Sequence, residues 1–322
     1  MAARPAAPFA RVPLGRGRAV ELWNEDAIAG IPRRIDRGSV DVVVTSPPYN
    51  LGVRYASYDD RRPRAEYLAW IGELGGAVDH ALSERGSFFL NVGGTSKDPW
   101  MPFEIATTIG RHFVLQNVIH WVKSIAIDRS AAGRSAGLAR DLALGHYKPV
   151  VSDRYLHGAQ EYIFHFSRHG TVPLDRLAIG VPYQDKSNVA RWQRAGADLR
   201  CRGNTWFLPY PTIQARERDR PHPATFPPEL PEWCFRLHGL GRLGHALDPF
   251  VGIGASAVAA ARLHVDFVGF DVDRPYLEVA RDRVRAERTV SRRAAGRTTR
   301  RRRPTGPRRP RSAASRPSSA SS

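Results

Sequence analysis

Runs of hydrophobic residues along the chain predict strands and helices in alternation. The run Val40–Val44 is almost continuously β-branched, which is typical of a parallel strand buried on both faces. Further strands are expected at 87–92, 113–122, 161–166, 245–250 and 266–270, and helices at about 64–82, 102–110, 257–263 and 275–288. This alternation favours an α/β fold, in which helices pack on a sheet.

The predicted strand–helix units fall into two blocks that lie far apart in the sequence. The residues between them are rich in glycine, proline, arginine and aromatic side chains and show one clear strand. We therefore expect a sheet divided by a less regular insertion. The expected division is a flexible basic arm (1–19), two sheet-forming halves (20–123 and 221–288), a middle region (124–220) and a disordered Arg-rich tail (289–322).

Composition narrows the class of protein. Hydrophobic residues make up 42% and charged residues 25% of the 322 residues, as in globular proteins, and no apolar run is long enough to cross a membrane. Residues 1–17 lack the apolar stretch of a signal peptide, so an intracellular location is expected. Two cysteines, Cys201 and Cys234, are too few for a disulfide framework or a cysteine-rich zinc site, and no metal is expected.

The positive charge is concentrated at the C-terminus. The net charge is +18, and the twelve arginines that follow Glu287 without any acid account for most of it, leaving +6 on residues 1–287. The tail combines arginine with serine, alanine and proline, a composition that cannot bury a core. Two interpretations stay open: the tail grips phosphates without regard to sequence, or it is a solubilising extension.

A glycine-rich loop lies between a strand and a helix near the C-terminus. It comprises residues 248–254 (Asp-Pro-Phe-Val-Gly-Ile-Gly), and Asp271 ends the next strand. Glycines let a backbone approach a cofactor closely, and an acid at that distance can accept hydrogen bonds from ribose hydroxyls. The pattern indicates a nucleotide-type cofactor without choosing one, because a nicotinamide dehydrogenase has much the same layout.

A rigid turn, residues 46–49 (Ser-Pro-Pro-Tyr), ends the first predicted strand. Two prolines can continue neither strand nor helix, and the strand end is where α/β enzymes bind ligands. A serine hydroxyl beside a free carbonyl suits an amino group, and the tyrosine ring suits a planar base. A turn that only ends the strand, with a packed tyrosine, explains the same residues, so both interpretations stay open here.

Taken together and in this order, the two motifs resemble the permuted (beta-type) family of DNA amino-methyltransferases, which act on N4 of cytosine or N6 of adenine. That family has a (Ser/Asp/Asn)-Pro-Pro-Tyr turn first, a target-recognition region next and an Asp-Pro-Phe-x-Gly-x-Gly loop last. Matching segments are Asn-Glu-Asp at 24–26, Ile-His-Trp-Val-Lys at 119–123, Glu-Tyr-Ile-Phe at 161–164, Gly-Asn-Thr-Trp at 203–206 and His-Pro-Ala-Thr-Phe-Pro at 222–227. The resemblance covers most of residues 20–287. It implies a Rossmann-like S-adenosylmethionine-dependent methyltransferase sheet with an inserted target-recognition region.

The resemblance also assigns roles to single residues. The catalytic residues that it implies are Ser46, Pro47, Pro48 and Tyr49, and the residues that bind S-adenosylmethionine are Asp26, Asp248, Phe250, Gly252, Gly254 and Asp271. Asp271 is expected at the ribose hydroxyls. Asp26 is expected near the adenine, and a helix N-cap explains it equally well. Residues 222–227 are expected to close over the cofactor, with Phe226 where many relatives have lysine.

The implied reaction is direct methyl transfer to an exocyclic amine, a poor nucleophile because its lone pair is delocalised into the base. Acceptors from Ser46 and the Pro47 carbonyl would favour a pyramidal nitrogen, which attacks the sulfonium methyl group without a covalent enzyme intermediate. The flipped base would stack on Tyr49. Methylation of cytosine carbon 5 is disfavoured, because those enzymes use a Pro-Cys pair and neither cysteine follows a proline.

Serine at the first position of the turn and the Phe-Pro form of the closing segment favour N4 of cytosine, with N6 of adenine as the alternative. The expected partner is double-stranded DNA, met by residues 124–215 and above all by 187–192. The candidate contacts are Lys123, Arg129, Arg134, Arg140, Lys148, Arg154, Arg191, Arg194, Arg200, Arg202, Trp192 and Trp206. A cognate restriction endonuclease, a monomer or homodimer, and a nucleoid-associated cytoplasmic location are expected as well.

Three other functions explain part of the pattern. Related Pro-Pro-Tyr turns methylate RNA adenines or a protein glutamine, but the large middle region and the permuted order favour DNA. A DNA-binding relative without activity is disfavoured because the motif residues are intact. The Ser-Pro-Pro-Tyr turn argues against a dehydrogenase.

Overall fold

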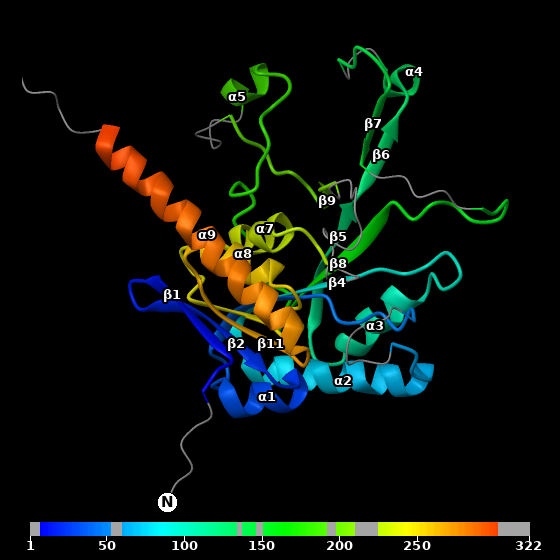
Figure 1. Cartoon of the computed structure of the whole chain (residues 1–322). Coiled ribbons are helices and arrows are strands. Elements are labelled where there is room, and N and C mark those ends of the chain that lie inside the picture. The colour runs from blue at the N-terminus through cyan, green and yellow to red at the C-terminus, as the bar shows by residue number, and fades with distance from the viewer. Residues whose placement is uncertain are drawn as a thin grey trace, which may run out of the picture.

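The protein is built on one nine-stranded sheet covered by helices (Figure 1). The computed structural model describes residues 7–52, 60–133, 137–145, 151–191, 198–209 and 225–301, with the backbone alone for 190 and 291–301. The strands are β1 (Ala10–Gly15), β2 (Arg18–Asn24), β3 (Val40–Thr45), β4 (Leu82–Val92), β5 (Val114–Val122), β6 (Ser124–Ile127), β7 (Leu142–Gly145), β8 (Gln160–Ser167), β9 (Thr205–Phe207), β10 (His245–Asp248) and β11 (Asp266–Asp271). The helices are α1 (Ala27–Arg34), α2 (Arg64–Ala81), α3 (Met101–Ile109), α4 (Arg129–Ala132), α5 (Ser187–Arg191), α7 (Glu229–His238), α8 (Ala255–Leu263) and α9 (Arg274–Arg301).

The centre of the sheet is parallel and buried, as the sequence predicts. The strand order is β1-β2-β11-β10-β3-β4-β8-β5-β9, and the strands from β2 to β4 all run parallel. Val42 and Val43 of β3 lie opposite Ala246 and Leu247 of β10, and all four side chains are fully buried. A continuously apolar strand is stable there because helices cover both of its faces.

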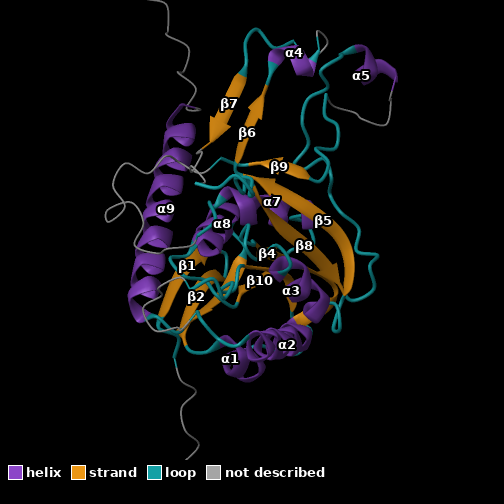
Figure 2. Ribbon diagram, turned by 90° about the vertical axis from the view of Figure 1, so that its right-hand side faces the viewer, coloured by secondary structure: helices purple, strands orange, loops and turns teal. Residues whose placement is uncertain are grey.

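Helices α1, α2 and α3 cover one face of the sheet, and α7, α8 and α9 cover the other (Figures 1 and 2). Helix α2 buries Tyr67, Ile71, Leu74 and Val78, which recur on one side at helical spacing. On the opposite face, α8 buries a row of alanines against α9. The core therefore has two hydrophobic layers, one on each side of the sheet.

The order in which the chain adds strands to the sheet changes sides between β10 and β3, which are parallel neighbours. From β10 it continues through α8 to β11 on one side, and from β3 through α2 to β4 on the other. Loops that leave two such strands diverge and open a crevice at the carboxyl edge of the sheet. This topology brings the turn at 46–49 and the loop at 248–254 together.

Both expected terminal segments differ from their predictions. Residues 10–19, expected in a flexible arm, form β1 and the start of β2, and β2 pairs with β11. Strand β1 buries Val12 and Leu14, and β2 buries Val20 and Leu22. The arginines between these side chains concealed their alternation. Residues 289–301, expected in a disordered tail, continue α9, and they contain no proline. Residues 302–322 lie outside the described residues.

The middle region is not one insertion, as was expected for 124–220. Strands β8 and β9 belong to the main sheet, with β8 antiparallel between β4 and β5. The β6–β7 hairpin and α4 project beyond the sheet, where α5 also lies (Figures 1 and 2). In the described part of the chain, no helix combines the length and apolar character needed to span a membrane.

Candidate active site

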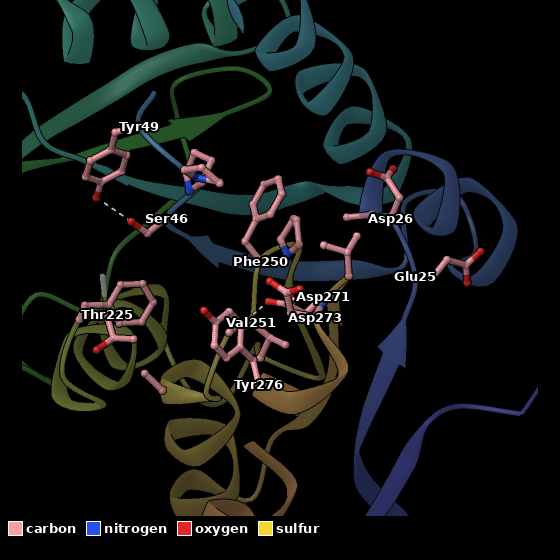
Figure 3. A pocket seen from close by; sticks show the side chains of 18 of the residues that line it. Glu25, Asp26, Ser46, Tyr49, Thr225, Phe250, Val251, Asp271, Asp273 and Tyr276 are labelled. Carbon is pink, nitrogen blue, oxygen red and sulfur yellow. Dashed lines mark hydrogen bonds between the residues drawn. The ribbon is translucent and has the colours of Figure 1, made fainter. Parts of the chain in front are cut away.

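One cleft of about 970 Å³ opens at the carboxyl edge, where the topology places it. Its walls come from the turn after β3, the loop after β10, the end of β11 and the starts of α1 and α9. Figure 3 shows Ser46 and Tyr49 at one end and Asp26 at the other, with Phe250 and Asp271 between them. Two motifs from opposite ends of the sequence thus form one site.

Asp271 is fixed in this cleft by two backbone amides. Gly252 donates its N–H to one carboxylate oxygen at 2.8 Å, and Asp273 donates its N–H to the other at 2.8 Å. Burial raises the pKa of Asp271 to about 6, because water is excluded from the charged form and the carboxylates of Asp273 and Asp248 repel it. A carboxylate held in this way is preorganised to accept hydrogen bonds from hydroxyl groups of a ligand.

Asp273 lines the same cleft and contains a buried polar atom that lacks a partner. Its Oδ1 accepts no hydrogen bond from the described residues, although the side chain is 3% exposed. A buried acceptor without a donor costs free energy, and a ligand that brings a donor removes that cost. Asp271 and Asp273 together therefore fit a cofactor with two neighbouring hydroxyl groups, such as the ribose of S-adenosylmethionine.

Two of the expected cofactor residues lie elsewhere. Asp248 does not line the cleft: its carboxylate is buried and accepts hydrogen bonds from Thr45, Ser256 and the Phe250 amide. Burial raises the pKa of Asp248 to about 6, while these three donors oppose the rise. The Asp248 side chain therefore connects the end of β3 to the glycine-rich loop and α8.

Gly254 is also absent from the cleft wall, and its conformation has another cause. It begins α8 in the left-handed region at φ 80°, and a Cβ atom there would lie 2.7 Å from that of Ala280 in α9. Glycine is required by helix packing at this point. Gly252 does line the cleft, with a positive φ of 49°, and its contact with a cofactor stays a prediction.

Asp26 forms the helix N-cap that was one of its two interpretations, and its expected place near the adenine stays a prediction. It caps α1 by accepting the amide hydrogen of Ala29 at 3.1 Å, and it lines the far end of the cleft. Its neighbour Glu25 also lines the cleft and pairs with Arg33 and Arg34.

The cleft has an aromatic wall that sequence reasoning missed in part. Trp70 of α2 lies 5.4 Å from Phe250, measured between ring centroids, and the guanidinium of Arg62 lies 5.4 Å from the Trp70 ring. Helical spacing marks Trp70 only as a core candidate, because the cleft forms when α2 packs beside the loop. Tyr276 of α9 and Thr225 and Phe226 of the closing segment complete the wall, while residues 222–224 lie outside the described range.

The Ser-Pro-Pro-Tyr turn is held rigidly at the other end of the cleft. Tyr67 of α2 donates its hydroxyl to the Pro48 carbonyl at 2.7 Å. Ser46 and Tyr49 join their hydroxyls at 2.6 Å, and all four residues of the turn line the cleft. These hydrogen bonds fix the Ser46 hydroxyl and the Tyr49 ring relative to each other at the cleft wall.

Behind the turn lie polar groups that the motifs did not assign. The side-chain amide of Asn91 in β4 donates to the Tyr49 hydroxyl at 2.8 Å and to Glu161 of β8 at 2.7 Å. Glu161 also pairs with Lys123 at 2.5 Å. The sequence indicated Glu161 and Lys123 only as members of segments that resemble the family. Their contact could not be predicted, because it depends on β8 lying between β4 and β5.

The cations expected to contact DNA have different surroundings. Arg129, Arg140, Arg154, Arg191 and Arg200 are exposed, whereas Arg134, Lys148, Trp192 and Arg194 lie outside the described residues. Arg202 lies over the Trp233 ring at 4.1 Å, and Trp206 is 1% exposed and packs on the same ring. Trp206 therefore belongs to the core, Arg202 is partly buried against Trp233, and Lys123 is paired with Glu161.

Comparison with known proteins supports the same family. Residues 40–282 match the model of a family described as DNA methylase, of the N6 and N4 type. The chain is 25% identical over 258 residues to the Type II methyltransferase M.HpaI of Haemophilus parainfluenzae, covering 79% of this chain and 71% of the relative. It is 27% identical over 257 residues to the Type II methyltransferase M.BglII of Bacillus subtilis, covering 76% and 64%.

Two solved structures share the fold. The PvuII DNA methyltransferase, described as cytosine-N4-specific, superposes with a TM-score of 0.57 at 15% identity, covering 87% of this chain and 95% of that one. A protein of Thermus thermophilus, assigned as a DNA modification methylase and complexed with S-adenosyl-L-methionine, gives a TM-score of 0.51 at 22% identity, covering 83% and 93%.

Proposed function

The chain belongs to the DNA methylase family that methylates N6 and N4 amines with S-adenosylmethionine, and from this premise we propose that it methylates N4 of cytosine in double-stranded DNA. The observation that carries the proposal is the placement of the Ser46 hydroxyl in the same cleft as the paired acids Asp271 and Asp273. Acceptor and cofactor would then meet across one short space, which is the requirement for direct transfer.

The residues of the cleft divide between the two ligands. Asp271 and Asp273 would hold the ribose hydroxyls, Phe250 and Gly252 would line the methionine side, and Asp26 would lie toward the adenine. When bound, S-adenosylmethionine supplies an electrophilic methyl group. We propose further that residues 225–288 form the cofactor-binding half of the fold.

The turn would bind the target amine. The Ser46 hydroxyl and the Pro47 carbonyl are acceptors for its two hydrogens, and this pairing draws the nitrogen lone pair out of the ring plane. The Tyr49 ring would stack on the flipped base, a contact worth about 1–3 kcal/mol. Because Tyr67 fixes the Pro48 carbonyl, little reorganisation is needed when a base arrives.

Cytosine is favoured over adenine by the residue types that the resemblance associates with each base. Serine stands at the first position of the turn, and the closing segment contains Phe226 followed by proline. Phe226 lines the cleft, which supports a part for this second feature in the choice of base. The exposed arginines of α4 and the segment before β7 would bind the duplex, and a paired endonuclease would match the Type II names of the relatives.

The test is the nucleoside mass spectrum of DNA incubated with the protein and methyl-labelled cofactor. Label on N4-methylcytosine is expected, with a loss of at least about 100-fold in Tyr49→Ala. The matched control is Tyr162→Ala, one position after Glu161, which should retain activity. Label on N6-methyladenine would overturn the base assignment, and label found only on RNA or protein would overturn the proposed function.

A further inference from the structure

Five polar side chains from four separate segments form one network behind the turn. Glu161 accepts hydrogen bonds from Lys123 at 2.5 Å through one carboxylate oxygen, and from Asn91 at 2.7 Å through the other. Tyr49 lies 3.2 Å from that second oxygen and 2.6 Å from the Ser46 hydroxyl. The network runs without a break from the cleft to a carboxylate paired with a cation.

The donors in this network fix its direction. Lys123 and the amide nitrogen of Asn91 can only donate, and each donates to a different oxygen of Glu161, so both oxygens of this carboxyl group act as acceptors. Turning the Asn91 side-chain amide over would place its oxygen against the carboxyl group of Glu161. In the present orientation the Asn91 Oδ1 is buried and accepts no hydrogen bond from the described residues. Tyr49 receives a hydrogen from Asn91 and has its own to give. The Tyr49 hydroxyl lies 3.2 Å from both Glu161 and the Asn91 carbonyl, and of these two acceptors only the carboxylate can keep a proton, which gives the order Ser46 to Tyr49 to Glu161.

Methylation of an amine releases a proton that must be taken up at the site. The nitrogen would form one bond to the methyl carbon as the carbon–sulfur bond of the cofactor breaks and leaves its electron pair on sulfur, and the nitrogen would lose one of its two bonds to hydrogen. Ser46 and Tyr49 are each neutral and can accept a proton only by passing on their own. Glu161 is the first group in the network that can keep it.

We propose that Glu161 is the final acceptor of this proton, reached through Ser46 and Tyr49, an inference that rests on the proposed function. The amine proton moves to the Ser46 oxygen as the serine hydrogen moves to Tyr49 and the tyrosine hydrogen moves to Glu161. The electron pair of the broken N–H bond stays on nitrogen, and the carboxylate becomes neutral. The Lys123 ammonium lies 2.5 Å from the other oxygen of the same carboxyl group. Glu161 is thus a positioning and proton-accepting residue that acts through Tyr49.

Tyr49→Phe and Glu161→Gln separate this relay from stacking and from folding. Phenylalanine keeps the ring and removes the hydroxyl, and glutamine keeps the shape and removes the charge. The readouts are kcat against pH at saturating DNA and cofactor, and cofactor affinity by calorimetry. Saturation with cofactor removes the effect of Asp271 on binding, and Asp248 is unchanged in both variants, so its titration is common to them and the wild type. The titratable groups that contact Glu161 from neighbouring segments are Lys123 and Tyr49.

Both variants should lower kcat by about 100-fold or more, which is about the contribution of one acid–base group. Cofactor affinity should stay within about twofold of the wild type. In the wild type, kcat should fall as the pH falls, because a protonated Glu161 cannot accept. This acid limb should be absent from both variants. Tyr162→Phe and the exposed Glu66→Gln make the same chemical changes outside the network and should match the wild type.

Three outcomes would overturn the relay or the function beneath it. Wild-type kcat in Tyr49→Phe would exclude the hydroxyl as a carrier. A lowered kcat that keeps the acid limb in Glu161→Gln would reduce Glu161 to a structural role. If the wild type methylates no base at all, the proposed function itself is wrong, and the relay falls with it.

Discussion

The Thr45 hydroxyl donates a 2.6 Å hydrogen bond to the buried carboxylate of Asp248. Thr45 is the last residue of β3, immediately before the catalytic turn, and Asp248 is the last residue of β10, immediately before the cofactor loop. The bond therefore connects the two halves of the cleft directly. Ser256 donates to the second Asp248 oxygen at 2.5 Å, which extends the connection into α8.

Thr45→Val should loosen this connection without unfolding the protein. The substitution keeps the shape and β-branching and removes one hydrogen bond to a charged group, so the free energy of unfolding should fall by about 1–3 kcal/mol. Because the turn is affected more than Asp271, kcat should fall more than cofactor affinity. Urea denaturation and kinetics measure the two effects. Equal losses in kcat and in cofactor affinity would contradict the role of Thr45 in placing the turn.

Cofactor affinity should weaken as the pH falls below about 6, the raised pKa of Asp271. Ribose hydroxyls donate to the ionised carboxylate, so binding favours deprotonation, and below that pKa a proton must be released on binding. The dissociation constant should rise by up to about tenfold per pH unit below 6 and stay level above it. Calorimetry of S-adenosylmethionine binding in buffers of different ionisation enthalpy tests both points.

The matched variant for this pH dependence is Asp271→Asn, which cannot ionise. It should bind more weakly at pH 8 and show a flat dependence of affinity on pH. If the dependence survives in Asp271→Asn, another group, with Asp248 as the first candidate, governs the titration.

Gly254→Ala should destabilise the fold more than it affects binding. A methyl group there meets Ala280 at 2.7 Å and requires a left-handed backbone, for a combined loss of at least about 2 kcal/mol. Thermal denaturation measures this loss. Gly241→Ala is the control, because nothing lies within 4 Å of the added atom and its φ is not positive. A stable Gly254→Ala variant that fails to bind cofactor would restore the direct role expected from the sequence.

Arg129→Ala and Arg140→Ala should weaken DNA binding without changing cofactor affinity. Each arginine is exposed on the segment that projects beyond the sheet. If each meets a phosphate, the slope of log affinity against log salt should fall by about one for each removal. Arg11→Ala, on the edge strand β1, is the control. An unchanged slope in the double variant would show that the duplex binds elsewhere.

The central strands and the residues of the candidate cleft could be predicted from local patterns along the chain. The apolar run of β3, the prolines that end it and the glycine loop are local patterns, and Ser46, Tyr49, Phe250, Gly252 and Asp271 all lie where those patterns indicated. Local patterns suffice here because strand ends in a parallel sheet meet at one edge, whatever separates them along the chain.

The polar groups that face the cleft could be identified only from the tertiary structure. Asp248 and Asp271 are both acids at the ends of parallel strands. Asp248 accepts hydrogen bonds from Thr45 and Ser256, whereas Asp271 lines the cleft. Glu161 meets Tyr49 because β8 inserts between β4 and β5, and Trp206 is buried because Trp233 packs on it. These outcomes depend on pairing between distant segments, whereas hydrophobic periodicity reports only on neighbours along one element.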